Sequence, residues 1–427
     1  MSDTKKLAIY GGKKTIEGKL QKYNSIGNEE IDAVTNVLKT GNLSQFLAAW
    51  GEDFYGGPKV LEFEANCKKY FKVNNAITVN SWTSGLVAIL GAIGLEPGDE
   101  VIVTPWTMCA SATAILHWNA IPVFADIEKD NFCISPDSVF KNITSKTKAI
   151  MSVDIMGQSA NVDALMKIAK KYNLKLISDS AQAPGSLYNG KFTGTLSHIG
   201  GFSLNYHKHI HTGEGGIIVT NDDVLAEKTR LIKNHAEAIV EAKGETDLRN
   251  MVGYNFRMGE IEAAIGIEQL KKLDDLVSSR QEIALRLTHG LNDLDGLTTP
   301  TIRDRCTHVF YVYGMKVDER KLGISKEKIK NALEKEGVPA LSTRFANVHL
   351  LPIFQKRIAF GSDGFPWTAD FSRKDVSYAK GICPVSEHLQ DSSYLGFELC
   401  KHSLSNNEVD LIIAAFKKVW SNLHLLK

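Results

Sequence analysis

The feature that most constrains the fold is a regular alternation of short apolar runs with longer amphipathic stretches, extending from about Glu29 to Leu276. Short apolar runs bounded by breakers are typical of buried strands, and the stretches between them have helical spacing. Strands that alternate with helices form a mostly parallel sheet covered by helices. The expected strands are Ala76–Val79, Glu100–Val103, Ile121–Phe124, Ala149–Val153, Lys175–Ile177, Gly200–Ser203 and Gly216–Thr220. The expected helices are Ser84–Ile93, Ala110–His117, Asn161–Tyr172 and Gly259–Arg280.

The pattern changes from about Leu285 onward. Thr307–Val317 alternates like a strand, and Ser325–Glu336 is expected to be an amphipathic helix capped by Ser325. A loop-rich stretch, Phe345–Phe371, and a terminal helix, Asn407–Leu423, follow. We therefore predict an α/β protein in three parts. Residues 1–24 form an N-terminal arm, residues 25–284 form a large domain around a mostly parallel sheet, and residues 285–427 form a smaller α+β domain.

Composition narrows the class of protein. The formal net charge is +1 and no basic cluster stands out, which argues against a nucleic-acid partner. The six cysteines are scattered without a CxxC pair, as in a reduced cytosolic protein. The N-terminus has no apolar signal segment, and the longest apolar runs are too short to span a bilayer. We expect a cytoplasmic, soluble protein with no membrane partner.

The most informative segment is Gly201–Gly216 (GFSLNYHKHIHTGEGG). Lys208 lies just past an expected strand that ends in serine, and a glycine-rich turn leads from it into the next strand. Most lysines on loops are solvated. A lysine held between two buried strands can have its pKa lowered enough to attack a carbonyl group, and this makes Lys208 a candidate nucleophile.

Asp179 ends another apolar strand in Leu176–Gly185 (LISDSAQAPG), and Gln182 follows three residues later. An aspartate here is often the N-cap of a helix. At the carboxyl edge of a parallel sheet, beside Lys208, it could instead keep the nitrogen of a pyridine cofactor protonated and so make the ring an electron sink. We favour the cofactor role.

These segments, together with Gly253–Gly266 (GYNFRMGEIEAAIG), resemble the DegT/DnrJ/EryC1/StrS family of sugar aminotransferases. The three motifs occur in the family's order, and the resemblance extends from about Asn42 to the C-terminus. It implies the aspartate-aminotransferase fold and pyridoxal 5'-phosphate as cofactor. Lys208 would form the Schiff base and move the proton between substrate and cofactor. Asp179 would pair with the ring nitrogen, and Gln182 would lie near the phenolic oxygen.

The resemblance also implies how the rest of the cofactor is held. Ser203 and the backbone amides of Asn80–Ser84, including those of Trp82 and Thr83, would bind the phosphate. Trp106 matches a position whose ring stacks on the cofactor, although a core tryptophan is the alternative. Asn255 matches an asparagine that reaches the phosphate of the neighbouring subunit, which implies a homodimer with shared active sites.

Three points depart from the pattern or leave alternatives open. Trp82 replaces the glycine usual in the phosphate turn, so that turn must avoid a positive φ or tolerate strain there. The alternating histidines His207, His209 and His211 would point the same way on an extended segment, yet nothing completes a metal site, so we predict none. Glu214 could be a general acid, but we favour a role in bracing the glycine turn.

The resemblance implies transfer of an amino group from L-glutamate or L-glutamine to a keto-sugar in amino-sugar biosynthesis. The acceptor would be a nucleotide-linked sugar, a cyclitol ketone or an oxidised higher sugar such as an octulosonate. One rival is a keto-sugar 3-dehydratase of the same fold, in which a histidine replaces the lysine. The three residues between Lys208 and Thr212 match the aminating members instead. The other rival is a non-catalytic regulatory protein, which an intact Lys208, Asp179 and Gln182 disfavour.

Overall fold

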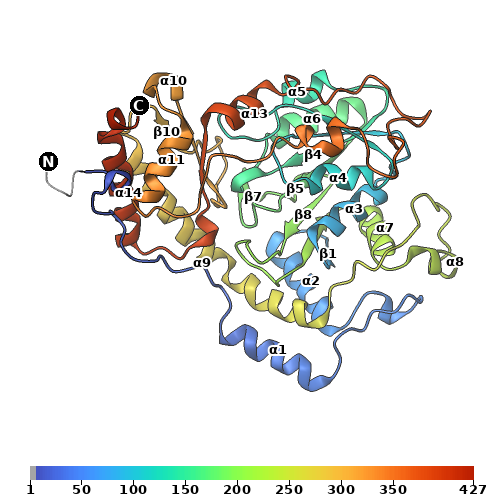
Figure 1. Ribbon diagram of the computed structural model, residues 1–427. Coiled ribbons are helices and arrows are strands. Elements are labelled where there is room, and N and C mark those ends of the chain that lie inside the picture. Colours follow the sequence, from blue (N-terminus) through green and yellow to red (C-terminus); the bar gives the residue numbers. More distant parts are fainter. Residues whose placement is uncertain (1–5) are drawn as a thin grey trace.

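The computed structural model describes residues 6–427 (Figure 1). They form a large sheet, a small sheet and a two-stranded sheet of β6 Leu187–Tyr188 and β7 Lys191–Phe192. The large sheet has seven strands in the order β1-β9-β8-β5-β4-β2-β3. From β3 to β8 the neighbouring strands are parallel, whereas β9 runs antiparallel to both β8 and β1. All seven predicted strands are confirmed. Their bounds are β1 Asn75–Val79, β2 Glu100–Val103, β3 Ile121–Phe124, β4 Thr147–Val153, β5 Lys175–Asp179, β8 Ile199–Ser203 and β9 Gly216–Thr220.

Helices follow most of these strands. In chain order they are α1 Asn28–Thr40, α2 Pro58–Phe71, α3 Trp82–Ala92, α4 Ala110–Leu116, α5 Pro136–Lys141, α6 Val162–Tyr172, α7 Asp223–Lys233, α8 Val240–Lys243, α9 Glu260–Leu291, α10 Glu319–Leu322, α11 Lys326–Lys335, α12 Pro352–Gln355, α13 Pro384–His388 and α14 Asn406–Ser421. The predicted helices are present, with ends shifted by a few residues. The longest, α9, runs eleven residues past its predicted end at Arg280.

The strands are buried on both faces, and their alternate side chains pack against different helices. Ala76 of β1 and Val219 of β9 lie in one cluster with residues of α2 and α9. Their neighbours Ile77 and Ile218 lie in a second cluster with α3. Because successive side chains of a strand point to opposite faces, a continuous apolar run serves both layers of helices.

The small domain is built on the second sheet, in the order β10-β11-β13-β12, and α9, α11 and α14 pack against it. Its strands are β10 Leu297–Thr298, β11 Tyr313–Val317, β12 Leu341–Ser342 and β13 Tyr394–Phe397. Leu7 and Ile16 of the N-terminal arm are buried in the same core. The predicted strand Thr307–Val317 is wrong in its first half. There the amides of Thr307 and Val309 bond to the carbonyls of Leu187 and Gly157 in the large domain instead of to a strand of the small sheet.

The domain boundary also differs from the prediction within residues 285–427. The segment from Val348 to Leu389 contributes to the core of the large domain. Phe354 contacts Phe124 with ring centroids 5.2 Å apart, and the Tyr378 hydroxyl donates to the Pro122 carbonyl at 2.8 Å. This segment carries large aromatic side chains that are buried against β3. Within residues 6–427 we find no helix with the length and apolar character needed to cross a membrane.

Candidate active site

The site lies where the chain leaves the parallel strands. Asp179 is the last residue of β5 and Ser203 the last of β8, so both side chains reach the same edge of the sheet. Since β9 is antiparallel, its first residue, Gly216, lies at that edge too, and the β8–β9 connection carrying Lys208 stays there. α3 begins at Trp82, shortly after β1 reaches this edge. Ligands of open α/β sheets bind at the carboxyl ends of strands, and the predicted residues converge there.

Two adjoining cavities occupy this edge. The inner cavity, of about 170 Å³, is lined by the predicted residues Trp82, Thr83, Asp179, Gln182, Ser203 and Lys208, among others. The outer cavity, of about 280 Å³, opens toward the small domain and is lined by Tyr311, Arg344, Phe345, Tyr394 and Glu398, among others. Both are lined by Thr107, Met108, Gln182, His207 and Lys208. The Lys208 amine therefore stands at the junction of the two cavities.

Asp179 is held by donors on both carboxylate oxygens and is only 4% exposed. The indole N–H of Trp82 and the backbone N–H of Ala181 donate to Oδ1 at 2.7 and 3.2 Å, and the Ser111 hydroxyl donates to Oδ2 at 2.7 Å. Burial raises the pKa of Asp179, and the bonds from Ser111 and Trp82 oppose this shift. A carboxylate fixed in this way offers a preorganised negative charge to a cationic group in the inner cavity.

Trp82 fits this place because glycines make room for it. A Cβ atom on Gly201 would come within 2.4 Å of the Trp82 ring, and one on Gly216 within 3.0 Å of its backbone. Trp82 is the first residue of α3 and does not have a positive φ, so the turn accepts a tryptophan without strain. The sequence did not reveal that its side chain binds Asp179.

The N-terminus of α3 offers the anion site that the resemblance implies. The Ser81 side chain caps the helix by accepting from the Ser84 amide at 3.1 Å. The amides of Trp82 and Thr83 donate to no residue within 6–427. Ser203, at the end of β8, lines the same cavity. Free amides at the positive end of a helix, with a hydroxyl beside them, suit a phosphate group.

Lys208 is 7% exposed, and its Nζ lies 4.4 Å from the centroid of the Tyr311 ring. Burial lowers the pKa of Lys208 to about 8, although the Asp179 carboxylate acts in the opposite direction. No side-chain hydrogen bond from Nζ is formed to any residue that the structure describes. A neutral, unengaged amine is the form that attacks a carbonyl carbon.

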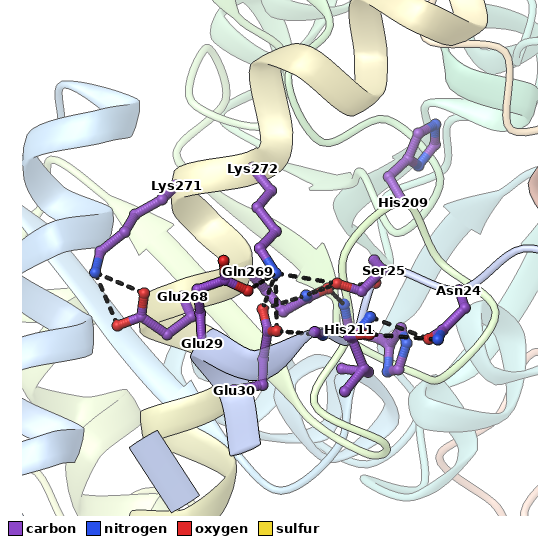
Figure 2. Close-up of polar contacts among 12 residues, drawn as sticks. Asn24, Ser25, Glu29, Glu30, His209, His211, Glu268, Gln269, Lys271 and Lys272 are labelled. Carbon is purple, nitrogen blue, oxygen red and sulfur yellow. Dashed lines mark hydrogen bonds and ion pairs between the residues drawn. The ribbon is translucent and has the colours of Figure 1, made fainter. Parts of the chain in front are cut away.

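The N-terminal arm and α9 hold the segment that carries Lys208 in place through hydrogen bonds (Figure 2). The Tyr23 hydroxyl donates to the His209 carbonyl at 2.5 Å. Gln269, fully buried in α9, accepts from the Ser25 hydroxyl at 2.6 Å and the His211 amide at 3.3 Å, and it donates to Glu30 at 2.8 Å. These contacts fix the backbone just after Lys208, at His209 and His211.

The three histidines do not share one side of the segment, because residues 206–210 form a turn and bends instead of an extended strand. His207 lines both cavities, whereas the ring of His209 is fully buried with Nε2 2.8 Å from the Val309 carbonyl. The backbone amide of His211 donates to the Gln269 side chain. The geometry that would have favoured a metal site is therefore absent here. Glu214 accepts from Asn205 at 2.8 Å across the turn, in line with the predicted bracing role.

Gln182 is oriented by a bond from the Met156 amide to its Oε1 at 2.8 Å. Met156 has a φ of 60°, which is rare for a residue other than glycine. The amide nitrogen of Gln182 remains available to the cavities that the side chain lines. Gln182 thus lines both cavities, and its predicted place near the phenolic oxygen of the cofactor stays a prediction.

Trp106 requires a correction. Its side chain has no exposed surface and lines neither cavity. It stacks on Phe345 at 5.3 Å between centroids and meets the edge of Tyr394 at 5.3 Å, so it supports two aromatic walls of the outer cavity from behind. Met108, two residues further on, is 60% exposed and lines both cavities. The backbone after β2 turns so that position 108, and not 106, faces the ligand space.

Asn255 is exposed and does not line either cavity of its own chain. Its Oδ1 accepts from Arg257 at 2.8 Å, and its carbonyl accepts from the Asn80 side chain at 3.3 Å. The loop is thus attached next to the turn that begins α3. Its predicted contact with a second subunit stays a prediction.

Several residues of the site were not predicted from the sequence. Met108 and Ser111 lie a few residues after Trp106. Their short distance in sequence from the end of β2 was the one signal that could have pointed to them. Tyr311 and Tyr394 come from distant parts of the chain, and no local motif marks them.

Comparison with known proteins agrees with this geometry. Residues 24–390 match the model of the DegT/DnrJ/EryC1/StrS aminotransferase family. The chain belongs to this family. The DegT/DnrJ/EryC1/StrS match confirms the predicted resemblance and fold class, and the protein is a pyridoxal phosphate-dependent aminotransferase.

Individual members show the extent of the similarity. The chain is 34% identical over 358 residues to the spore coat polysaccharide biosynthesis protein SpsC of Bacillus subtilis, covering 82% of this chain and 89% of that one. It is 32% identical over 369 residues to the GDP-perosamine synthase of Caulobacter vibrioides, covering 85% and 90%. The aminotransferase from Psychrobacter cryohalolentis superposes with a TM-score of 0.81 at 28% identity, covering 95% of this chain and 100% of that one.

The residues present fit pyridoxal phosphate. A buried carboxylate, Asp179, faces the inner cavity that a buried amine, Lys208, also lines. At the same cavity lie the free amides of α3 and the Ser203 hydroxyl. This set supplies a counter-charge for a protonated ring, a nucleophile for an aldehyde and donors for a phosphate.

Proposed function

We propose that this aminotransferase moves an amino group from L-glutamate or L-glutamine to the ketone of a sugar or cyclitol, in amino-sugar biosynthesis. The acceptor classes are a nucleotide-linked keto-sugar, a cyclitol ketone and an oxidised higher sugar such as an octulosonate. Relatives named for spore coat polysaccharide biosynthesis and for GDP-perosamine support this class of product.

One observation carries the proposal: Lys208 stands where the inner and outer cavities meet. The inner cavity contains the groups suited to the cofactor, and the outer one has room for a substrate beside the same amine. When bound, pyridoxal phosphate supplies an electron sink for the carbon that carries the amine. Asp179 stabilises positive charge on the ring, and Lys208 moves a proton to and from the substrate carbon at its Nζ.

The outer cavity is suited to a polyhydroxylated ring. Its walls combine the aromatic side chains of Tyr311, Phe345 and Tyr394 with the polar side chains of Ser342 and Glu398. Aromatic faces pack against the apolar face of a sugar, while polar groups accept and donate to its hydroxyls.

We further propose that the protein works as a homodimer in which Asn255 completes the phosphate site of the partner. The Asn255 loop is bonded to the turn that begins α3, yet its side chain lies outside the cavity of its own chain. This placement supports a role toward a second chain.

The rival 3-dehydratase requires a histidine in place of the attacking amine. The buried Lys208, at the cavity junction with a lowered pKa, supports amination over dehydration. A regulatory protein without catalysis would bind the cofactor and show no turnover.

The test follows the two half-reactions separately in the purified protein. Visible absorption of the bound cofactor should disappear with L-glutamate or L-glutamine and return when a keto-sugar or cyclitol ketone is added. Mass spectrometry should then identify the aminated product. Borohydride followed by peptide mapping should find the cofactor on Lys208, and Lys208→Ala should not turn over. Loss of a hydroxyl without gain of an amine would show the dehydratase, and no change with any donor would show the regulatory protein.

A further inference from the structure

We infer that Arg344 binds the α-carboxylate of the amino donor and so selects α-amino acids as donors. The inference rests on the proposed function, in which the donor is L-glutamate or L-glutamine. Each of these carries a carboxylate on the carbon that bears its amine. Once that amine reaches the junction at Lys208, the carboxylate must find a partner close by. A carboxylate is best stabilised by a cationic partner that donates two parallel hydrogen bonds to it.

The positively charged candidates around the outer cavity are few. Its basic lining residues are His207, Lys208 and Arg344. Lys208 has the proposed proton-transfer role at the substrate carbon, and an ion pair with the carboxylate would take its amine out of that role. Burial and the nearby Lys208 lower the pKa of His207 to about 4, so its ring is neutral at pH 7. The guanidinium of Arg344 is planar and cationic, and its fork of donors matches a carboxylate with two parallel hydrogen bonds.

The Arg344 side chain is free to take such a partner. Within residues 6–427 its guanidinium forms no ion pair, and no side-chain hydrogen bond from it is present. Glu398, the carboxylate on the same wall, is paired with Lys401 at 2.8 Å instead. The outer cavity thus contains an unneutralised cation.

The backbone around Arg344 is fixed, in contrast to the free side chain. The Arg344 amide donates to the Ser342 hydroxyl oxygen at 3.2 Å, and that hydroxyl donates to the Arg344 carbonyl at 2.6 Å. The buried Lys326 ammonium donates to the Thr343 carbonyl at 2.9 Å, and the Phe345 amide donates to the Gln390 side chain at 2.8 Å. A fixed backbone limits the conformational entropy lost when the guanidinium engages a ligand.

The consequence is discrimination between donors. An α-amino acid gains the paired contact with Arg344, whereas an amine of the same shape without the α-carboxylate leaves the guanidinium unpaired. A site built around a charged hydrogen-bonding group disfavours the analogue that lacks the partner by a large factor.

The experiment measures the first half-reaction alone, as the rate at which the cofactor absorbance disappears in a single turnover. L-glutamine is compared with 4-aminobutanamide, and L-glutamate with 4-aminobutanoate, each the same molecule without its α-carboxylate. Wild type should favour each amino acid by about 100-fold or more, as expected for a bidentate charged pair. Arg344→Gln should lose most of that preference by slowing the amino acids, with little effect on the two amines. Arg344→Lys should recover part of it.

Two controls keep the outcome clear. Arg320→Gln removes an exposed arginine on the small domain, outside both cavities, and should leave the preference unchanged. Protein loaded with pyridoxamine phosphate reports the acceptor half-reaction separately. If Arg344→Gln keeps the full preference, or slows only the acceptor half-reaction, the inference is overturned. If wild type aminates no ketone at all, the proposed function fails instead, and the donor preference still reports on Arg344.

Discussion

The indole N–H of Trp82 donates to the Asp179 carboxylate at 2.7 Å, and this bond joins the first residue of α3 to the last residue of β5. The same helix N-terminus presents the amides suited to a phosphate. Trp82 therefore connects the part of the site suited to the phosphate with the carboxylate suited to the ring nitrogen. A substitution at Trp82 should remove one of the hydrogen bonds that hold the Asp179 carboxylate.

Replacing Trp82 by Phe should keep the packing between the glycines and remove the donor. We expect kcat/KM to fall by about 10- to 100-fold, because a hydrogen bond to a buried charge contributes about 1.5–3 kcal/mol. Ser111→Ala removes the bond to the other carboxylate oxygen and should have a similar effect. Asp179→Asn should be more damaging, since a neutral amide cannot hold the ring proton. Near-normal activity of Asp179→Asn would mean that this aspartate is only a structural residue.

The lowered pKa of Lys208 gives a pH-dependent signature in the cofactor-free protein. The neutral amine reacts with the aldehyde, so the rate of pyridoxal phosphate uptake should increase with pH and level off above about 8. An exposed lysine would continue to gain rate toward its ordinary pKa of 10.5. Asp179 raises the pKa of Lys208, so Asp179→Asn should move the midpoint to lower pH. Stopped-flow absorbance measures the rate; a midpoint near 10 would contradict the buried, desolvated amine.

Trp106 and Met108 should have separable roles. Trp106→Phe leaves a gap behind Phe345 and Tyr394 and should lower the free energy of unfolding by about 1–3 kcal/mol, with cofactor affinity retained. Met108→Ala should weaken cofactor binding by about 0.3–1.5 kcal/mol, the range of a thioether–aromatic contact. Thermal denaturation and a cofactor titration distinguish the two. The opposite pattern would restore Trp106 as the stacking residue.

Shared sites predict complementation between inactive variants. Lys208→Ala and Asn255→Ala should each be inactive or nearly so. After subunit exchange, one site of the mixed dimer carries both lesions and the other carries neither, so activity should partly return. A tag on one variant confirms that exchange took place. With exchange confirmed, an absence of recovery would show that each chain builds its own site.

Much of the site was visible in the sequence because each element is local. Lys208 and Asp179 follow from the strand ends and turns that apolar periodicity and glycines mark, whereas Gln182, Ser203 and Thr83 are implied by the family resemblance. A strand that ends at a known residue also fixes the sheet edge where its side chain emerges. This is why Asp179 and Ser203, at the ends of neighbouring strands, line the same cavity.

Trp106 shows where local pattern was insufficient. Both position 106 and position 108 follow the same strand, and which one faces the cavity depends on how the chain turns after β2. Phe345 and Tyr394, two aromatic partners of Trp106, lie more than 200 residues away in the sequence. The Trp106 indole packs against them in the core. Burial of a large apolar ring decides the outcome, and its partners cannot be found within the segment itself.

The sequence by itself determined the order of strands and helices, the sheet edge where the cavities lie, and the lysine and aspartate that we assign to the chemistry, because periodicity and turn residues act over short distances. Only the tertiary structure decided that the Trp82 side chain holds Asp179, that Val348–Leu389 covers the large domain, and that Arg344 stands free at the outer cavity. Those results depend on packing between segments far apart in the chain, where shape and desolvation, and not local propensity, select the contacts.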